Sequence, residues 1–281
     1  MSQRPPHFLP YQGSKRLLAP QILAALGDRR FRRIYEPFAG SGAVTLAAAH
    51  RSLADAFVLG DSLRSLADLW RQVLTDPAVL AQGYERLWHA QELDRDGHFL
   101  SIRAEFNQSA NPAALLYLLA RCAKNAPRFN QSGAFNQAED RRRRGVHPAR
   151  LTPQLMQVAA LLQGRCEVRD GDFADQLRDA GPDDLAYLDP PYEGTSVGRD
   201  RRYHQGLNRE RLVAELQHLI DRKVPFLLSY DGRTGDRRYG EPLPERLGLR
   251  RLELHAGRSS QATLAGRVEW TVESLYVSGG M

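Results

Sequence analysis

Residues 33–50 read RIYEPFAGSGAVTLAAAH, and this stretch decides the fold class. An apolar strand is expected at 33–36, a glycine-rich turn follows it, and the small and apolar side chains of 43–50 favour a helix. A second apolar run at 56–60 ends at Asp61. A strand, glycine-rich turn, helix, strand and acidic residue in this order are typical of the start of a doubly wound, Rossmann-like α/β sheet.

The rest of the chain continues this pattern after a long interruption. Helical spacing predicts helices at 15–26, 66–74, 78–88, 113–122 and 208–222. Strand patterns appear at 166–169, 184–188, 224–229, 249–255 and 268–277, but no clear strand lies between 63 and 162. We therefore predict an α/β domain built from residues 1–64 and 166–281, interrupted by a mostly helical inserted domain at 65–165.

Composition limits the classes of protein that this chain can belong to. With 42% hydrophobic and 26% charged residues among 281, it is too apolar to be disordered throughout. The longest apolar stretch, at 112–120, is too short for a membrane span, and the first residues lack the apolar core of a secretory signal. Two cysteines and dispersed histidines predict neither a disulfide framework nor a metal site, so a cytoplasmic location is expected.

The excess of positive charge consists almost wholly of arginine. There are 39 Lys and Arg against 33 Asp and Glu, a net charge of +6, and only Lys15, Lys124 and Lys223 are lysines. Arginine suits phosphates and guanine edges, which makes a polyanionic partner plausible. An arginine-rich composition explains scattered arginines equally well, so the charge alone does not identify a partner.

The glycine-rich turn by itself has several interpretations. Its position between a strand and a helix lets a ligand approach the backbone of Gly40 and Gly42 at a helix N-terminus. The Gly-Lys-Ser/Thr of a P-loop is missing, and the three-glycine dinucleotide fingerprint is incomplete. Asp61 after the next strand could hold the two hydroxyls of a ribose, or could cap a helix.

Residues 185–192, LAYLDPPY, form a more specific motif. Two prolines at the end of a buried strand stop the hydrogen-bond ladder and fix an extended turn. The Asp189 carboxylate, the Pro190 carbonyl and the Tyr192 ring then converge on one place. These groups suit a planar heterocycle with an exocyclic amine, because two acceptors can take its N–H groups while the aromatic ring stacks on it.

Together these motifs resemble the Dam-type group of DNA adenine N6-methyltransferases, an alpha-group amino-methyltransferase family. The matching stretches, in order, are YQGSK at 11–15, PFAGSGAV at 37–44, RFN at 128–130, GAFN at 133–136, DPPY at 189–192, RSS at 258–260 and ESLY at 273–276. The resemblance thus covers most of the chain. In that family a target-recognition domain is inserted between the glycine-rich motif and DPPY, which agrees with the helical insertion expected here.

The resemblance implies S-adenosylmethionine as the cofactor and specific residues around it. The implied cofactor-binding residues are Tyr11, Lys15, Pro37, Phe38, Gly40, Gly42, Asp61, Asp172, Phe173 and Asp189. The implied catalytic residues are Asp189, Pro190 and Tyr192. The family often has Trp where Tyr11 stands. Hydrogen bonds from an adenine N6 amine to Asp189 and Pro190 would localise its lone pair toward the methyl group, once the base has been flipped out of the duplex.

The segment 124–150 is our prediction for the main DNA-contacting region. Its amide and basic side chains are types that contact base edges and phosphates. The predicted contacts are Lys124, Asn125, Arg128, Asn130, Gln131, Asn136, Gln137, Arg141, Arg142, Arg143 and Arg144, although the last four could equally be a solvated loop. We expect double-stranded DNA as the partner, no membrane, and a monomer or weak dimer. A cognate restriction endonuclease would accompany a restriction-modification enzyme but not a solitary methylase.

Other functions remain as alternatives or are excluded. Cytosine C5 methylation requires a nucleophilic cysteine that normally follows a proline, and neither Cys122 nor Cys166 has that setting. Cytosine N4 methylation uses the same catalytic floor and stays open. Modifiers of RNA or glutamine rank lower, because many carry Asn at the position of Asp189 and lack the insertion. A non-catalytic DNA-binding protein on this fold is the alternative from a different class.

Overall fold

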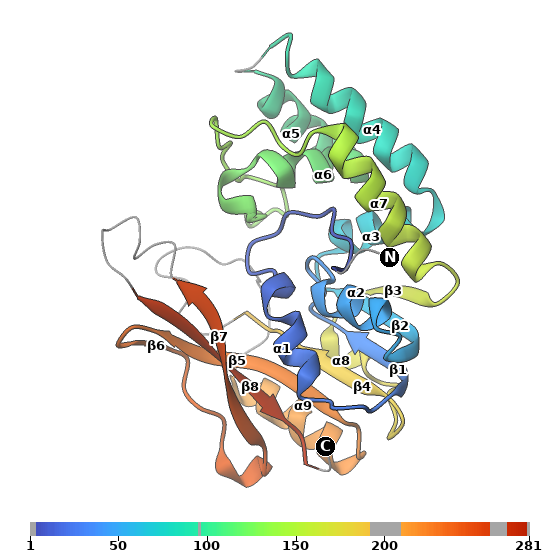
Figure 1. Ribbon diagram of the computed structural model, residues 1–281. Coiled ribbons are helices and arrows are strands. Elements are labelled where there is room, and N and C mark those ends of the chain that lie inside the picture. Colours follow the sequence, from blue (N-terminus) through green and yellow to red (C-terminus); the bar gives the residue numbers. More distant parts are fainter. Residues whose placement is uncertain (1–3, 95–96, 192–208, 259–268, 280–281) are drawn as a thin grey trace.

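The computed structural model describes residues 4–94, 97–191, 209–258 and 269–279, arranged around a central sheet (Figure 1). The strands are β1 Phe31–Glu36, β2 Ala54–Asp61, β3 Cys166–Asp170, β4 Leu185–Leu188, β5 Phe226–Thr234, β6 Arg237–Tyr239, β7 Arg250–Arg258 and β8 Trp270–Val277. The α-helices are α1 Ala19–Ala24, α2 Ala43–His50, α3 Arg64–Thr75, α4 Pro77–Ala90, α5 His98–Ser109, α6 Pro112–Arg121, α7 Pro148–Leu162, α8 Phe173–Gln176 and α9 Arg209–Asp221. Short 3₁₀ helices are η1 Lys15–Leu17, η2 Ala123–Asn125 and η3 Glu245–Leu247.

The sheet has the order β3-β2-β1-β4-β5-β8-β7, with β6 paired to β5. Strands β1 to β5 pair in parallel, whereas β8 is antiparallel to both β5 and β7. This order confirms the predicted Rossmann-like α/β class. The chain proceeds outward from β1 in one direction and from β4 in the other, so the carboxyl ends of β1 and β4 form the crevice where such sheets bind ligands.

The two faces of the sheet are covered by different helices. Because successive strand residues point to opposite faces, Ile34 and Tyr35 on β1 belong to two separate hydrophobic clusters. The cluster around Ile34 includes side chains of α1, α2 and α3, and the cluster around Tyr35 includes side chains of α8 and α9. Each face is therefore buried, as a parallel sheet requires.

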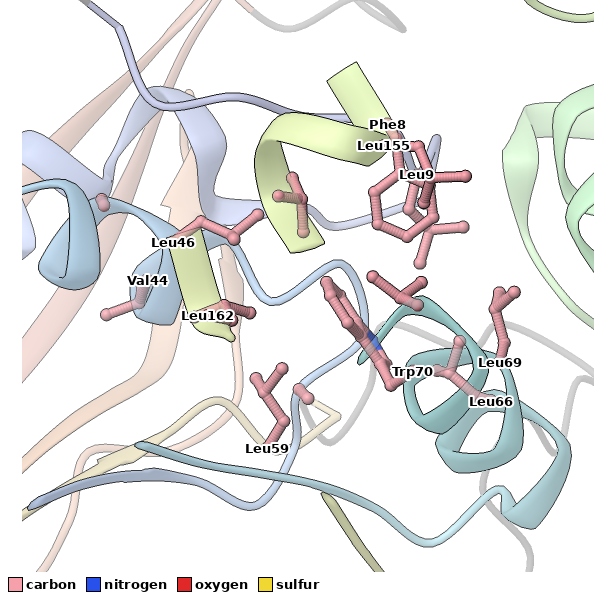
Figure 2. Close-up of a cluster of buried hydrophobic side chains, with 14 of the residues drawn as sticks. Phe8, Leu9, Val44, Leu46, Leu59, Leu66, Leu69, Trp70, Leu155 and Leu162 are labelled. Carbon is pink, nitrogen blue, oxygen red and sulfur yellow. The ribbon is translucent and has the colours of Figure 1, made fainter. Parts of the chain in front are cut away.

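Helices α3 to α7 pack on one another at one end of the molecule, above the sheet in Figure 1. Helix α3 also contacts β2 and β3. Figure 2 shows Trp70 of α3 beside Phe8 and Leu155, in a core that continues from the sheet into the helical segment. The domain boundaries at 64/65 and 165/166 stay a prediction.

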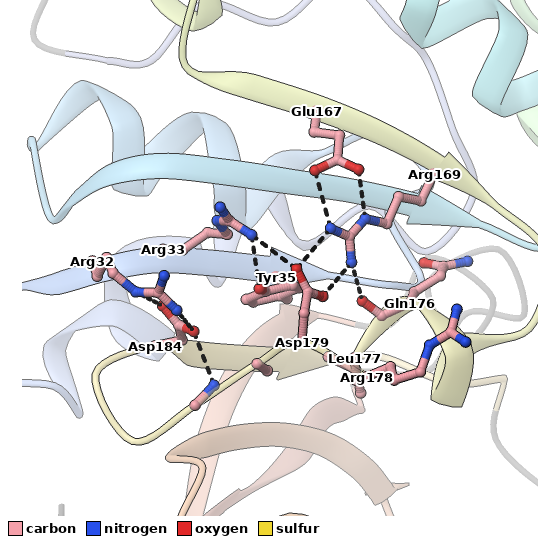
Figure 3. Close-up of polar contacts among 12 residues, drawn as sticks. Arg32, Arg33, Tyr35, Glu167, Arg169, Gln176, Leu177, Arg178, Asp179 and Asp184 are labelled. Carbon is pink, nitrogen blue, oxygen red and sulfur yellow. Dashed lines mark hydrogen bonds and ion pairs between the residues drawn. The ribbon is translucent and has the colours of Figure 1, made fainter.

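A polar network joins β1 and β3 to the segment before β4 (Figure 3). Arg169 donates to both Glu167 and Asp179, and Arg33 reaches the same Asp179 at 3.0 Å. Arg32 forms a two-bond pair with Asp184 at 3.0 and 2.6 Å. Because these arginines are partly exposed, each ion pair contributes only modestly to the stability of the fold.

The sequence patterns located most elements but missed several short or weakly patterned ones. Helices α5, α7 and α8, the short strand β6 and the 3₁₀ helices η2 and η3 were not predicted, and the helix expected at 15–26 is divided into η1 and α1. Pro20 lies in the first turn of α1, where its missing N–H is tolerated, so a new helix begins there. In the described ranges, no helix is long and apolar enough to cross a membrane.

Candidate active site

The glycine-rich turn after β1 adopts a backbone that requires its glycines. Gly40 and Gly42 have φ of 48° and 61°, in the left-handed region. A Cβ on Gly42 would lie 2.8 Å from Cζ2 of Trp70, and one on Gly40 would lie 3.2 Å from Cε1 of Tyr11. The Trp70 indole N–H also donates to the Gly40 carbonyl oxygen at 3.0 Å. Tyr11 and Trp70 therefore enclose the turn, and Trp70 is a site residue that sequence reasoning missed.

Asp61 at the end of β2 braces the same turn. Its Oδ2 accepts the Gly40 N–H at 3.2 Å, and its Oδ1 accepts the Leu63 N–H at 2.9 Å. The side chain is buried, and burial raises the pKa of the carboxyl to about 6 against the effect of the two N–H donors. Each oxygen keeps a second lone pair, so the carboxylate can still accept a pair of hydroxyls.

Asp189 lies directly after β4 and forms an ion pair with Lys15. The Lys15 Nζ is 3.0 Å from Asp189 Oδ1 and 3.1 Å from Oε2 of Glu273, which lies on β8. Burial by itself would lower the pKa of Lys15, but the two carboxylates outweigh it and raise that pKa. Burial raises the pKa of Asp189 to about 6, with Lys15 opposing and Glu273 adding to the rise. Sequence matching noted Glu273 but did not place it in the site.

Glu36, the last residue of β1, is a second buried acid that sequence reasoning did not select. Its Oε2 accepts the backbone N–H of Thr45 at 2.7 Å, which ties the strand to the first turn of α2. Only 3% of the residue is exposed, and burial raises the pKa of its carboxyl to about 7. Because Glu36 directly precedes the PFAGSG motif, its position beside the glycine-rich turn was the available signal.

Two aromatic rings and a further acid lie beside β2. The rings of Phe38 and Phe173 have centroids 5.2 Å apart. Asp172 caps α8 by accepting the Ala174 N–H at 3.0 Å, and the same Oδ1 receives Arg211 at 2.6 Å. The guanidinium of Arg211 also lies over Phe173, at 5.4 Å from its centroid. Arg211 was missed because it comes from α9, far along the chain.

The structure brings most of the predicted cofactor and catalytic residues to the carboxyl edge of the sheet. Pro37 and Pro190 are buried beside the ends of β1 and β4. Ser14, next to Lys15, has its Oγ 2.7 Å from Oγ of Ser41, so the N-terminal segment is joined to the glycine-rich turn. Tyr192 lies outside the described residues. Across those residues, no group of His, Cys, Asp and Glu side chains could hold a metal ion.

The predicted DNA-contacting segment forms a hairpin followed by an arginine-rich loop. Phe129 and Phe135 pair as an antiparallel bridge, and Cys122 pairs with Glu139. The buried Arg121 forms an ion pair with Glu139, which anchors the base of the loop. The side chains of Lys124, Asn130, Asn136, Arg141, Arg142, Arg143 and Arg144 are exposed, and those of Asn125 and Arg128 are half-buried.

Two amide side chains of this segment serve the hairpin itself. Gln137 is buried and donates to the Ala126 carbonyl at 3.1 Å, so the interpretation that it contacts DNA is wrong for this conformation. Asn130 Oδ1 accepts from the Ser132 and Ala134 backbone N–H groups at 3.0 and 2.9 Å. That oxygen organises the turn, which leaves the amide nitrogen of Asn130 as its group for outside contacts.

The hairpin segment also touches the N-terminal segment that carries Tyr11. The backbone N–H of Gln12 donates to the Asn125 carbonyl oxygen at 2.9 Å. Lys124 and Asn125 have φ of 60° and 52°, two consecutive left-handed residues that are not glycine. The Asn125 side chain stabilises this bend by donating to the Leu119 carbonyl at 2.8 Å and by accepting from Arg143.

Comparison with known proteins places this chain in a family. The model for D12 class N6 adenine-specific DNA methyltransferases matches residues 11–250. The DNA N-6-adenine-methyltransferase of Escherichia phage P1 is 29% identical over 79% of this chain, which spans 29% of that phage protein. The DNA adenine methylase of Vibrio cholerae is 25% identical over 82% of this chain and 83% of its own length.

Similarity to solved structures is weaker. A methyltransferase from Agrobacterium tumefaciens, described as SAM dependent, has 12% sequence identity and a TM-score of 0.39, over 94% of this chain and 62% of that one. A TM-score this low does not establish a shared fold, and the strand order and the family match carry the assignment. The chain belongs to the family of D12 class N6 adenine-specific DNA methyltransferases.

Proposed function

We propose that this protein transfers a methyl group from S-adenosylmethionine to the N6 amine of adenine in double-stranded DNA. One observation carries the proposal: Asp189 after β4, the glycine-rich turn after β1 and Asp61 at the end of β2 share the crevice at the carboxyl edge of the sheet. The family match and the adenine methylase relatives support adenine as the base.

The residues around the crevice fit S-adenosylmethionine. Asp61 supplies two oriented oxygens for ribose hydroxyls, and Gly40 and Gly42 leave the backbone of the turn free of side chains. Phe38 and Phe173, with Asp172 beside them, provide an aromatic wall and an acceptor for an adenine ring. When bound, the cofactor supplies an electrophilic methyl group.

The chain's own contribution to the reaction is to bind and orient the amine. The Asp189 carboxylate and the Pro190 carbonyl would accept the two N–H groups of the exocyclic amine, which directs its lone pair away from the ring. As the new carbon–nitrogen bond forms and the carbon–sulfur bond breaks, the amine becomes positive and then releases a proton to water. The negative charge of Asp189 favours that transition state more than the neutral ground state.

The exposed basic and amide side chains at 124–144 are the proposed contacts to DNA, within a helical target-recognition domain at 65–165. A base stacked in a duplex cannot reach Asp189, so the target must be flipped out, at a cost of a few kcal/mol. We assign the arginines of 141–144 to phosphates and the hairpin at 128–136 to base edges. This chemistry serves either a solitary methylase or the partner of a restriction endonuclease.

The decisive experiment measures transfer of labelled methyl groups from S-adenosylmethionine to duplex DNA. Wild type should produce N6-methyladenine, identified by mass spectrometry of digested nucleosides. Asp189→Ala should lose turnover and keep DNA affinity, while Asp221→Ala, an exposed acid on α9, should behave as wild type. Activity retained in Asp189→Ala would refute the assignment. If the product is N4-methylcytosine, the methylated base is cytosine and the assignment of adenine is wrong.

A further inference from the structure

A second acid contacts the lysine that pairs with Asp189. Glu273 comes from β8, where its Cα partners are Gly232 on β5 and Leu254 on β7. Its Oε2 lies 3.1 Å from the Lys15 Nζ, almost the same distance as the 3.0 Å between that Nζ and Asp189 Oδ1. One ammonium is therefore shared by two carboxylates.

All three groups are largely removed from water. The side chains of Lys15, Asp189 and Glu273 are 9%, 17% and 18% exposed. A single Lys–Asp pair has no net charge. In such surroundings a second carboxylate costs free energy, because its negative charge repels that of the first. Among these three described side chains there are two acids for one base, so with both acids ionised the trio carries one net negative charge.

The backbone keeps Glu273 in this place. A Cβ at Gly232, the partner of Glu273 on β5, would lie 2.7 Å from the Val272 carbonyl oxygen, so β5 and β8 approach closely here. Lys15 is held from the other side, since the preceding Ser14 contacts Ser41 of the glycine-rich turn. The Lys15 ammonium thus lies between the two carboxylates and contacts one oxygen of each, Oδ1 of Asp189 and Oε2 of Glu273.

We propose that Glu273 is a positioning residue for methyl transfer: by sharing the Lys15 ammonium, it preserves negative charge and a free acceptor oxygen on Asp189. This inference rests on the proposed role of Asp189. An amine that becomes positive in the transition state is stabilised by a cluster with a net negative charge and much less by a neutral ion pair. Lys15 still orients Asp189 through its own hydrogen bond.

The arrangement predicts opposite effects of two substitutions on the ionisation of Asp189. Glu273 raises the pKa of Asp189 and Lys15 lowers it, so Glu273→Gln should lower that pKa and Lys15→Met should raise it. Within the part of the chain that the structure describes, Glu36 on β1 and Tyr187 on β4 are further ionisable groups near the cluster, and both variants leave these two residues unchanged. A role of Glu273 in folding alone would leave the pKa of Asp189 where it is.

The test combines single-turnover kinetics with a direct titration. In Glu273→Gln, the methyl-transfer rate constant should fall about tenfold at high pH. The acidic limb of the pH profile should move to lower pH by about one pH unit in the same variant. In Lys15→Met the acidic limb should move to higher pH. Titration of ¹³C-labelled aspartate carboxyl groups in the free protein should show the same two shifts for Asp189.

Glu253→Gln is the matched control, because Glu253 lies on the neighbouring β7, is 50% exposed and pairs with Arg233. It should leave the rate and the acidic limb unchanged. Thermal melting identifies any variant that fails to fold, and the titration of Lys15→Met then tests the inference independently. An unshifted Asp189 titration and a wild-type acidic limb in folded Glu273→Gln would overturn the role of Glu273. The role of Asp189 is judged separately by Asp189→Ala.

Discussion

The indole N–H of Trp70 donates to the carbonyl oxygen of Gly40 at 3.0 Å, so the first helix after β2 holds the glycine-rich turn directly. The Trp70 ring also occupies the space beside Gly42, where a Cβ would lie 2.8 Å from it. One side chain therefore sets both the hydrogen bonding and the shape of the turn.

Trp70→Phe should destabilise the protein and weaken cofactor binding. The substitution keeps an aromatic ring but leaves the buried Gly40 carbonyl without its donor, which costs about 1–3 kcal/mol. Chemical denaturation measures the loss. Trp88→Phe is the control, because the Trp88 Nε1 is buried and has no hydrogen-bond partner in the described part of the chain. Equal losses in the two variants would show that the Trp70 hydrogen bond contributes nothing.

Asp61→Asn should reduce the affinity for S-adenosylmethionine by about tenfold or more, because the amide nitrogen cannot accept either a backbone N–H or a ribose hydroxyl. Isothermal titration calorimetry of the free protein measures this change. Asp68→Asn removes a carboxylate from the exposed side of α3, where it pairs with Arg71, and should leave the affinity unchanged. Full affinity in Asp61→Asn would remove Asp61 from the cofactor site.

Glu36 makes the stability of the free protein depend on pH with a definite sign. Its folded pKa of about 7 lies above the ordinary value of 4.5, so the folded state binds the proton more tightly than the unfolded state. The contribution of the protonated Glu36 carboxyl to the free energy of unfolding is complete below pH 4.5. It is lost as pH rises through about 7, and the total change in the free energy of unfolding is on the order of 3 kcal/mol.

Glu36→Gln, which keeps an acceptor for the Thr45 N–H, should therefore gain stability relative to wild type as pH rises from 5 to 8. The quantity to measure is the difference in the free energy of unfolding between the two proteins at each pH. A difference that stays constant across this range would mean that Glu36 ionises in the folded protein as it does in water.

Replacing Arg141, Arg142, Arg143 and Arg144 together by Gln should weaken DNA binding and flatten its salt dependence. If all four contact phosphates, the slope of log affinity against log salt should decrease by about 3 to 4. Arg142 and Arg143 pair with Asp140 in the free protein, so part of their charge is already balanced. The control replaces Arg30 and Arg51 by Gln. Both residues are exposed and lie just before β1 and β2, at the amino edge of the sheet. An unchanged slope would mark 141–144 as a solvated loop.

Local sequence patterns predicted the sheet well because its strands are short apolar runs between clear turn signals. Helix α7 escaped prediction because Pro153 lies inside it and because the polar segment before it hides its start. Helix α5 buries only Phe99, Ile102 and Phe106, too few apolar positions for a convincing helical face. Strand β6 has three residues and forms only by pairing with the extended end of β5.

The site was predictable where a motif carries it and not where distant elements meet. Asp61 and Asp189 each follow a predicted strand, so their place at the carboxyl edge followed from the sheet. Lys15 and Glu273 are 258 residues apart in the sequence and meet only because β8 inserts between β5 and β7. No local spacing encodes that contact, which depends on the complete strand order.

The hydrogen bond from Gln12 to Asn125 has a consequence for exchanging specificity between relatives. The hairpin segment cannot be exchanged independently, because Asn125 near its start accepts a backbone hydrogen bond from Gln12, in the segment beside the glycine-rich turn. A graft that begins after residue 125 keeps this hydrogen bond and the two left-handed residues, Lys124 and Asn125. A graft that begins before residue 124 must bring a backbone able to present the same carbonyl oxygen, or it will loosen the N-terminal segment beside the glycine-rich turn together with the new hairpin.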